Sequence, residues 1–79
     1  MRLTLYGRRY CHLCEDMERA LGPLQDELGF TLEFVDVDRD AALERKYGEL
    51  VPLLAGPDGR EICHYFLDVR ALAERLAVK

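Results

Sequence analysis

Two cysteines three positions apart, Cys11 and Cys14, are the residues of this sequence with the clearest capacity for chemistry. They follow an alternating segment, residues 3–6, and precede a run with helical periodicity, so the pair falls where a strand passes into a helix. At a helix start, the Cys11 sulfur lies near unpaired backbone N–H groups and the positive end of the helix dipole, which favour thiolate over thiol. Cys14, one turn further, lies on the same side and can close a disulfide with Cys11. The spacing therefore predicts a nucleophilic Cys11 and a resolving Cys14.

A zinc site is the main alternative for two closely spaced cysteines, because Cys63 and His64 supply two further candidate ligands. Adjacent residues on a regular strand point to opposite faces, however, so Cys63 and His64 cannot both reach one ion. We therefore expect no metal, and we interpret Cys63 as a small buried apolar residue. Covalent haem attachment requires a histidine directly after the second cysteine, where this sequence has Glu15.

The first half of the chain predicts a strand, a long helix and a second strand. The apolar residues of the helix are spaced by three and four from Leu13 to Leu28, and they keep this phase through Gly22-Pro23, where we expect a kink rather than a break. Gly29 is suited to ending the helix. The next segment, residues 30–37, is apolar on both faces, which predicts a strand in the centre of the sheet.

Three aspartates, Asp36, Asp38 and Asp40, stand between the second strand and a short second helix that ends at Gly48. They resemble a carboxylate cluster, but their stagger across a strand end and a helix start favours helix capping and solubility over metal binding.

The second half of the chain predicts a hairpin and a last helix. Residues 56–59, Gly-Pro-Asp-Gly, form a turn, so the strands on either side, 51–54 and 61–65, should pair antiparallel. Asp68 is positioned to cap the last helix. The fold class expected is therefore α/β, with the order βαβαββα and a four-stranded mixed sheet flanked by helices. Residues 1–79 are expected to form a single domain.

The composition argues against several functional classes. The 11 basic residues are outnumbered by 15 acidic ones, and the net charge of -4 has the wrong sign for a nucleic-acid binder. No segment approaches the roughly 20 apolar residues of a membrane span, and the N-terminus has no apolar run of signal-peptide length. We therefore expect a cytoplasmic protein that binds neither nucleic acid nor membrane.

Together these features resemble the glutaredoxins and their small bacterial glutaredoxin-like relatives. The resemblance rests on Tyr6-Gly7-Arg8 ahead of the cysteine pair, on Val51-Pro52 before a hairpin and on the βαβαββα order, and it covers essentially the whole chain. It implies a thioredoxin-like fold of glutaredoxin type. It also implies a cis peptide bond between Val51 and Pro52 beside the cysteines, where the backbone of Val51 pairs with a bound thiol substrate.

The same resemblance implies contacts with glutathione, and the sequence departs from the family pattern in two places. Arg8 would meet a glutathione carboxylate and Asp68 its amino group. Glutaredoxins usually carry proline where His12 stands here, and a Gly-Gly pair, which helps to hold glutathione, where residues 64–67 stand. When protonated, His12 can stabilise the neighbouring thiolate.

The function predicted first is that of a thiol–disulfide oxidoreductase, which needs no metal or organic cofactor. Its partners would be a disulfide-containing protein or a small thiol, with glutathione as a candidate co-substrate, and it would act as a monomer. Two alternatives remain open. One is a thioredoxin-fold binding module with non-catalytic or regulatory cysteines, and the other is a dimer in which Cys11 and glutathione hold an iron–sulfur cluster.

Overall fold

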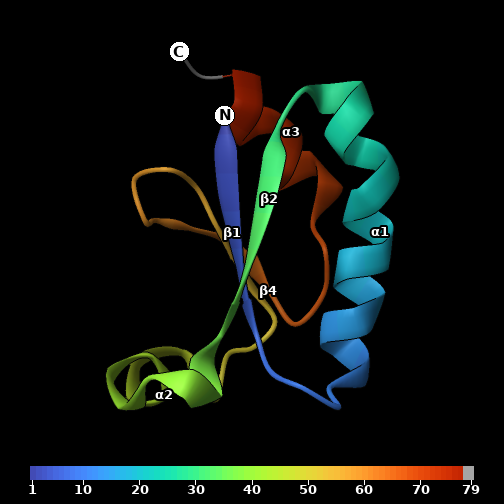
Figure 1. The fold of residues 1–79 in the computed structure, drawn as a ribbon. Helices are drawn as coiled ribbons and strands as arrows, with labels where there is room; N and C mark the ends of the chain where they lie inside the picture. Colours follow the sequence, from blue (N-terminus) through green and yellow to red (C-terminus); the bar gives the residue numbers. More distant parts are fainter. Residues whose placement is uncertain (78–79) are drawn as a thin grey trace.

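A four-stranded mixed sheet with helices on both sides forms the body of the protein in the computed structural model, which describes residues 1–77 (Figure 1). The order of elements is the predicted βαβαββα, with one additional 3₁₀ turn between the second strand and the second helix. The elements are β1 (Arg2–Gly7), α1 (His12–Leu28), β2 (Thr31–Asp36), η1 (Val37–Arg39), α2 (Ala41–Tyr47), β3 (Leu53–Ala55), β4 (Glu61–His64) and α3 (Val69–Ala77).

The strands lie in the order β2-β1-β3-β4. The first two are parallel, as expected for strands joined through a helix, and the hairpin strands β3 and β4 are antiparallel. Strand β3 also runs antiparallel to β1, with Leu54 opposite Leu5. These pairings place β1, which leads directly to the cysteines, in the middle of the sheet.

The predicted central position of the second strand is wrong, because β2 lies at an edge of the sheet. Its inward residues pack as expected, since Leu32 contacts the main core. On the same strand, however, Phe34 leaves 40% of its surface exposed. The Phe34 ring covers the end of β1 near Cys14. This packing accounts for an apolar residue on the outer part of an edge strand, where no further strand lies beside it.

Helix α1 is continuous through Pro23 and buries Cys14, Met17 and Leu21 against the sheet. It ends at Gly29 in the left-handed conformation, with φ of 72°, where the Gly29 N–H donates to the carbonyl oxygen of Gln25 at 2.9 Å. This conformation favours glycine, as the sequence predicts.

Two apolar clusters hold the helices to the sheet. In Figure 1, α1 and α3 lie on one side of the sheet, and α2 lies near the end where β2 finishes. The larger cluster joins the sheet to α1 and α3, and the smaller one lies around α2. The larger contains Leu3, Leu5, Met17, Leu21, Phe30, Leu54, Cys63 and Leu72, and the smaller contains Val37, Tyr47, Leu53 and Ala55.

Asp36 and Asp40 cap the helical segments, which confirms the capping interpretation for these two, whereas Asp38 caps neither segment and its Oδ1 lies 3.8 Å from Arg8 Nη2. Asp36 Oδ1 accepts from the Asp38 N–H at 2.9 Å, and Asp40 Oδ1 accepts from the Ala42 N–H at 2.8 Å. Asp68 Oδ1 accepts from the Ala71 N–H at 2.9 Å at the start of α3. Among the helices of residues 1–77, none has the length and apolar character needed to cross a bilayer.

The position of Leu5 in the sheet gives a first testable prediction. Leu5 is fully buried between Phe34 and Leu54 on the neighbouring strands. We expect Leu5→Ala to lower the free energy of unfolding by about 3 kcal/mol, because it removes buried methyl groups and leaves a cavity. Urea unfolding measures this loss. Thr4→Ala, one residue earlier on the opposite face, should cost less than about 1 kcal/mol, and equal losses would contradict the proposed core.

Candidate functional site

The cysteine pair stands at the junction of β1 and α1, where Cys11 is the N-cap residue of a 17-residue helix. Its backbone is extended, with φ of -108° and ψ of 109°, and its sulfur accepts a hydrogen bond from the backbone N–H of Cys14 at 3.2 Å. Cys11 thus occupies the capping position that serine or aspartate usually fills. The Cys11 sulfur therefore lies at the end of α1 where the backbone N–H groups of the first turn have no partner within the helix.

Cys14 is in a different environment, because only 2% of its surface is exposed. Burial, together with its side-chain hydrogen bond to Cys11, raises the pKa of Cys14 from 9.0 to about 12. The Cys14 thiol therefore keeps its proton at neutral pH. Both cysteines are free thiols in this structure, so it represents the reduced form.

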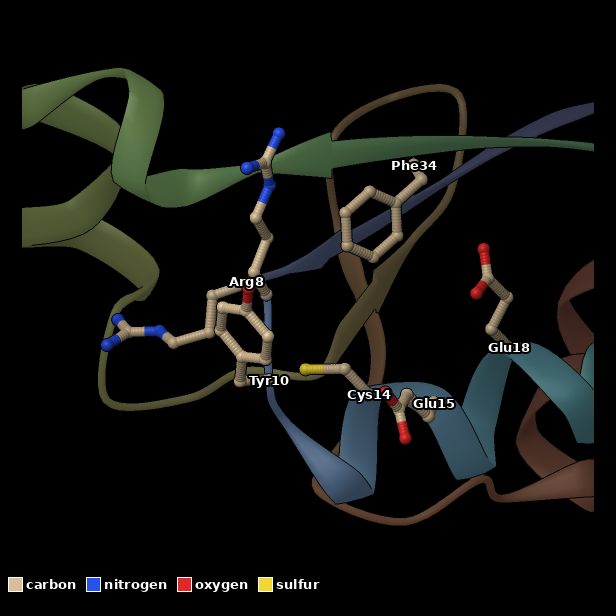
Figure 2. A pocket seen from close by; sticks show the side chains of 7 residues that line it. Arg8, Tyr10, Cys14, Glu15, Glu18 and Phe34 are labelled. Carbon is tan, nitrogen blue, oxygen red and sulfur yellow. The ribbon is translucent and has the colours of Figure 1, made fainter.

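A hollow of about 440 Å³ opens beside the buried cysteine (Figure 2). Figure 2 shows the Cys14 sulfur pointing from α1 toward Tyr10, with the Phe34 ring above it. Arg8 lies at one end of the hollow and Glu15 and Glu18 lie at the other, so the hollow carries charges of both signs. Its lining residues are Arg8, Arg9, Tyr10, Cys14, Glu15, Glu18 and Phe34.

Gly7 allows β1 to approach both Cys14 and Phe34. A Cβ atom at position 7 would lie 3.1 Å from the Cys14 sulfur and 2.9 Å from Cε2 of Phe34, closer than a side chain tolerates without displacement. The absence of a side chain at Gly7 therefore lets the thiol lie against the end of the strand, under the ring of Phe34. The sequence does not predict that the Phe34 ring lies over the Cys14 thiol. This placement becomes visible only once β2 is known to be an edge strand.

Arg8 is directed toward η1 and α2 rather than along α1. Its Nη2 donates to the carbonyl oxygen of Gly48 at 3.0 Å, and the same nitrogen lies 3.8 Å from Asp38 Oδ1 and 4.0 Å from Glu44 Oε1. Its Nε is buried without a hydrogen-bond partner in the described part of the chain. Arg8 therefore links the loop before the cysteines to α2, and its predicted contact with a substrate carboxylate stays a prediction.

The other predicted site residues lie on different elements. The peptide bond between Val51 and Pro52 is cis, and the carbonyl oxygen of Pro52 accepts from the Tyr65 N–H at 2.8 Å. Asp68 uses one carboxylate oxygen to cap α3. The side chain of His12 is 98% exposed, and its Nδ1 lies 4.0 Å from the carboxylate of Glu15. The expected contacts of these residues with a bound thiol substrate therefore stay predictions.

Cys63 is buried on β4, as predicted, within the core that α1 and α3 share. Burial raises its pKa, and the thiol remains protonated at neutral pH. The third cysteine thus occupies an apolar position in the core.

Comparison with known proteins identifies relatives over nearly the whole length of the chain. The family model described as Glutaredoxin-like domain (DUF836) matches residues 2–77. Protein Ne2328 from Nitrosomonas europaea, solved by NMR, is 40% identical and superposes with a TM-score of 0.87, covering 96% of this chain and 91% of its own. A protein from X. campestris, XcR50, solved by X-ray crystallography, is 42% identical with a TM-score of 0.74, covering 98% of this chain and 97% of its own.

A malarial protein that is only 21% identical shares the fold, with a TM-score of 0.69 and coverage of 98% of this chain and 97% of its own. Among proteins with curated descriptions, no relative matches the sequence. The fold and the family are therefore established by structural and sequence relatives, whereas the chemistry has to be argued from the site itself.

The raised pKa of Cys14 predicts a pH dependence of stability. Below pH 9 both the folded and the unfolded states hold the Cys14 proton, whereas between pH 9 and about 12 the unfolded state loses it first, so stability falls as the pH rises. This single group should cost up to about 1.4 kcal/mol per pH unit in that window. Urea unfolding of the reduced protein at pH 8 and pH 10 measures the decline.

The matched variant is Cys14→Ser, which does not titrate in this range and should show a shallower decline than the wild type. Some decline should remain in the variant, because burial also raises the pKa of Cys63 and of Tyr6. Identical slopes in the two proteins would contradict the protonated, buried state of Cys14.

Proposed function

The chain belongs to the family of glutaredoxin-like domains, and from this premise we propose that it is a thiol–disulfide oxidoreductase in which Cys11 is the nucleophile and Cys14 the resolving thiol. The observation that carries the proposal is the asymmetry of the pair. The Cys11 sulfur caps the helix and accepts a backbone N–H at 3.2 Å, whereas the Cys14 thiol is buried and holds its proton. One sulfur is thus prepared to attack, and the other is protected until it is needed.

In the first step, the thiolate of Cys11 attacks one sulfur of a substrate disulfide. A new disulfide forms between Cys11 and that sulfur, the substrate S–S bond breaks, and the second substrate sulfur leaves as a thiolate that takes a proton from solvent. The product is a mixed disulfide between the protein and half of the substrate.

In the second step, Cys14 loses its proton to solvent and its thiolate attacks the sulfur of Cys11. The Cys11–Cys14 disulfide forms, and the remaining half of the substrate leaves as a thiolate that is protonated by solvent. Although burial dominates the pKa of Cys14, the backbone N–H and the positive charge of Arg8 act in the opposite direction and favour the thiolate that this step requires. In total the substrate gains two electrons and two protons, and the protein dithiol becomes a disulfide.

Return to the dithiol requires two electrons from a thiol reductant, and we propose glutathione or a reductase as their source. In this proposal Arg8 and Asp68 contact the charged groups of glutathione, His12 lies beside the thiolate, and Val51 and Pro52 border the bound thiol. Arg8 would bind a carboxylate while its Nη2 donates to Gly48, near Asp38 and Glu44. Glutathione thus has to compete with two carboxylates of the protein for this guanidinium. The exchange itself needs no metal or organic cofactor, and the protein acts as a monomer in the cytoplasm.

Alkylation with iodoacetamide tests the nucleophile. We expect Cys14→Ser, which keeps the backbone N–H that bonds to Cys11, to react at pH 6.5 at least about tenfold faster than an unstructured cysteine peptide, because its thiolate is favoured. Mass spectrometry should place the label on Cys11. The control Cys11→Ser keeps only the two buried cysteines and should react more slowly than the peptide.

Turnover with hydroxyethyl disulfide tests the reaction. The wild type should reduce it with a thiol reductant present, and Cys11→Ser should lose essentially all of this activity. Alkylation of Cys11 at the rate of an unstructured thiol, together with no reduction above the uncatalysed rate, would overturn the oxidoreductase proposal. The binding module with non-catalytic cysteines would then be the better hypothesis.

A further inference from the structure

A second hollow, of about 300 Å³, lies on the opposite flank of α1 from the hollow beside Cys14. It is formed where the segment that follows β4 passes the first turns of α1. Its apolar lining consists of Leu13, Met17 and Ala20 from α1 and Tyr65, Phe66 and Leu67 from this segment. These residues include the stretch in which the family's Gly-Gly pair is replaced by side chains.

The backbone at Tyr65 is held in a conformation that residues with side chains seldom adopt. Its φ is 64°, in the left-handed region, where a Cβ atom crowds the following carbonyl oxygen. Two hydrogen bonds fix it there: its N–H donates to the carbonyl oxygen of Pro52 at 2.8 Å, and its hydroxyl donates to that of Glu49 at 2.7 Å. The segment is therefore anchored to the loop that carries the cis proline.

This anchored segment presents an aromatic ring to solvent. Phe66 follows directly after Tyr65 and leaves 71% of its surface exposed, and Leu13 on the facing side of the hollow is 36% exposed. Strained backbone that is held by specific hydrogen bonds is typical of positions that bind a ligand. Exposed apolar side chains that gather around a hollow are likewise typical of a binding surface.

We propose that this hollow, the Leu13–Phe66 subsite, binds an apolar side chain that neighbours the disulfide-bonded cysteine of a peptide or protein substrate. The proposal rests on the oxidoreductase function and names its substrate class. Leu13 lies between the two cysteines in the sequence, and the Tyr65 N–H donates to the Pro52 carbonyl oxygen. The subsite therefore adjoins the helical turn that carries Cys11, within reach of a peptide bonded to its sulfur.

The position beside Cys11 and the charge of the hollow both favour a peptide over glutathione as its occupant. Within residues 1–77, the only charged residue that lines the hollow is Asp16, which also lies 3.6 Å from Arg19. Glutathione brings carboxylates and no apolar side chain, so it gains nothing from this subsite. A peptide with an apolar residue beside its cysteine gains a contact, and the mixed disulfide tethers it so that a weak contact suffices.

A single-turnover experiment with the full chain tests the proposal. The reduced protein is mixed with an excess of one of two symmetric peptide disulfides, in which the cysteine is flanked on both sides by leucine or by serine. The second-order rate of Cys11–Cys14 oxidation is then measured for each peptide. We expect the wild type to react about tenfold faster with the leucine peptide, which is the range that a few buried methylene groups provide.

Phe66→Ser should bring the ratio of the two rates close to one. Leu28→Ser is the matched control, because Leu28 is as exposed as Leu13 but lies at the other end of α1, and this variant should keep the wild-type ratio. A wild-type ratio near one, or an unchanged ratio in Phe66→Ser, would overturn the subsite.

Two other results would also overturn the proposal, and they can be told apart. If the wild type fails to react even with hydroxyethyl disulfide, the oxidoreductase function fails, and the subsite falls with it. If sedimentation shows a dimer of the wild type that Phe66→Ser dissociates, the patch is an interface between two copies of the chain rather than a substrate subsite.

Discussion

The close approach of Cys14 to the end of β1 is the constraint on which the rest of the site depends. The absence of a side chain at Gly7 favours it, since a Cβ atom there would lie 3.1 Å from the Cys14 sulfur and 2.9 Å from Cε2 of Phe34. The strand is in turn held in the middle of the sheet by its pairing with β2 and β3 and by the buried side chains of Leu3 and Leu5. With β1 and Cys14 both fixed, α1 must begin where it does, and the Cys11 sulfur must cap it. The chemistry of the pair is therefore a consequence of how the core packs.

The difference between the two sulfurs gives the proposed reaction its direction. A fully exposed pair would compete for the substrate, and a fully buried pair would reach none. Here the cap position of Cys11 supplies a backbone donor and leaves the residue partly exposed, while burial and the hydrogen bond to Cys11 raise the pKa of Cys14 to about 12. The attacking sulfur and the resolving sulfur are thus set by their surroundings in the fold, although both belong to the same residue type.

Much of this arrangement is predictable from local sequence, and the misses have a common cause. The cysteine spacing, the capping aspartates and the turn at residues 56–59 act within a few residues, so their patterns can be read from the chain, and the family resemblance extends them to the fold. The position of β2 depends instead on which strands pair with each other. A strand that is apolar on both faces can be central, or it can be an edge strand such as β2, whose Phe34 covers a thiol. The direction of Arg8 depends on α2, which begins more than thirty residues later. Local patterns carry no information on such distant contacts.

The segment after β4 shows how a departure from a family pattern can itself be informative. A Gly-Gly pair accepts left-handed backbone at little cost and leaves space above it. In this chain a left-handed residue in this segment is Tyr65, and its cost is offset by hydrogen bonds to Pro52 and Glu49. The segment thus presents aromatic side chains where a Gly-Gly pair would leave bare backbone. A site that keeps its two cysteines but changes the surface beside them is expected to catalyse the same reaction on a different substrate. The proposed substrate class therefore follows from Tyr65 and Phe66 rather than from the cysteines.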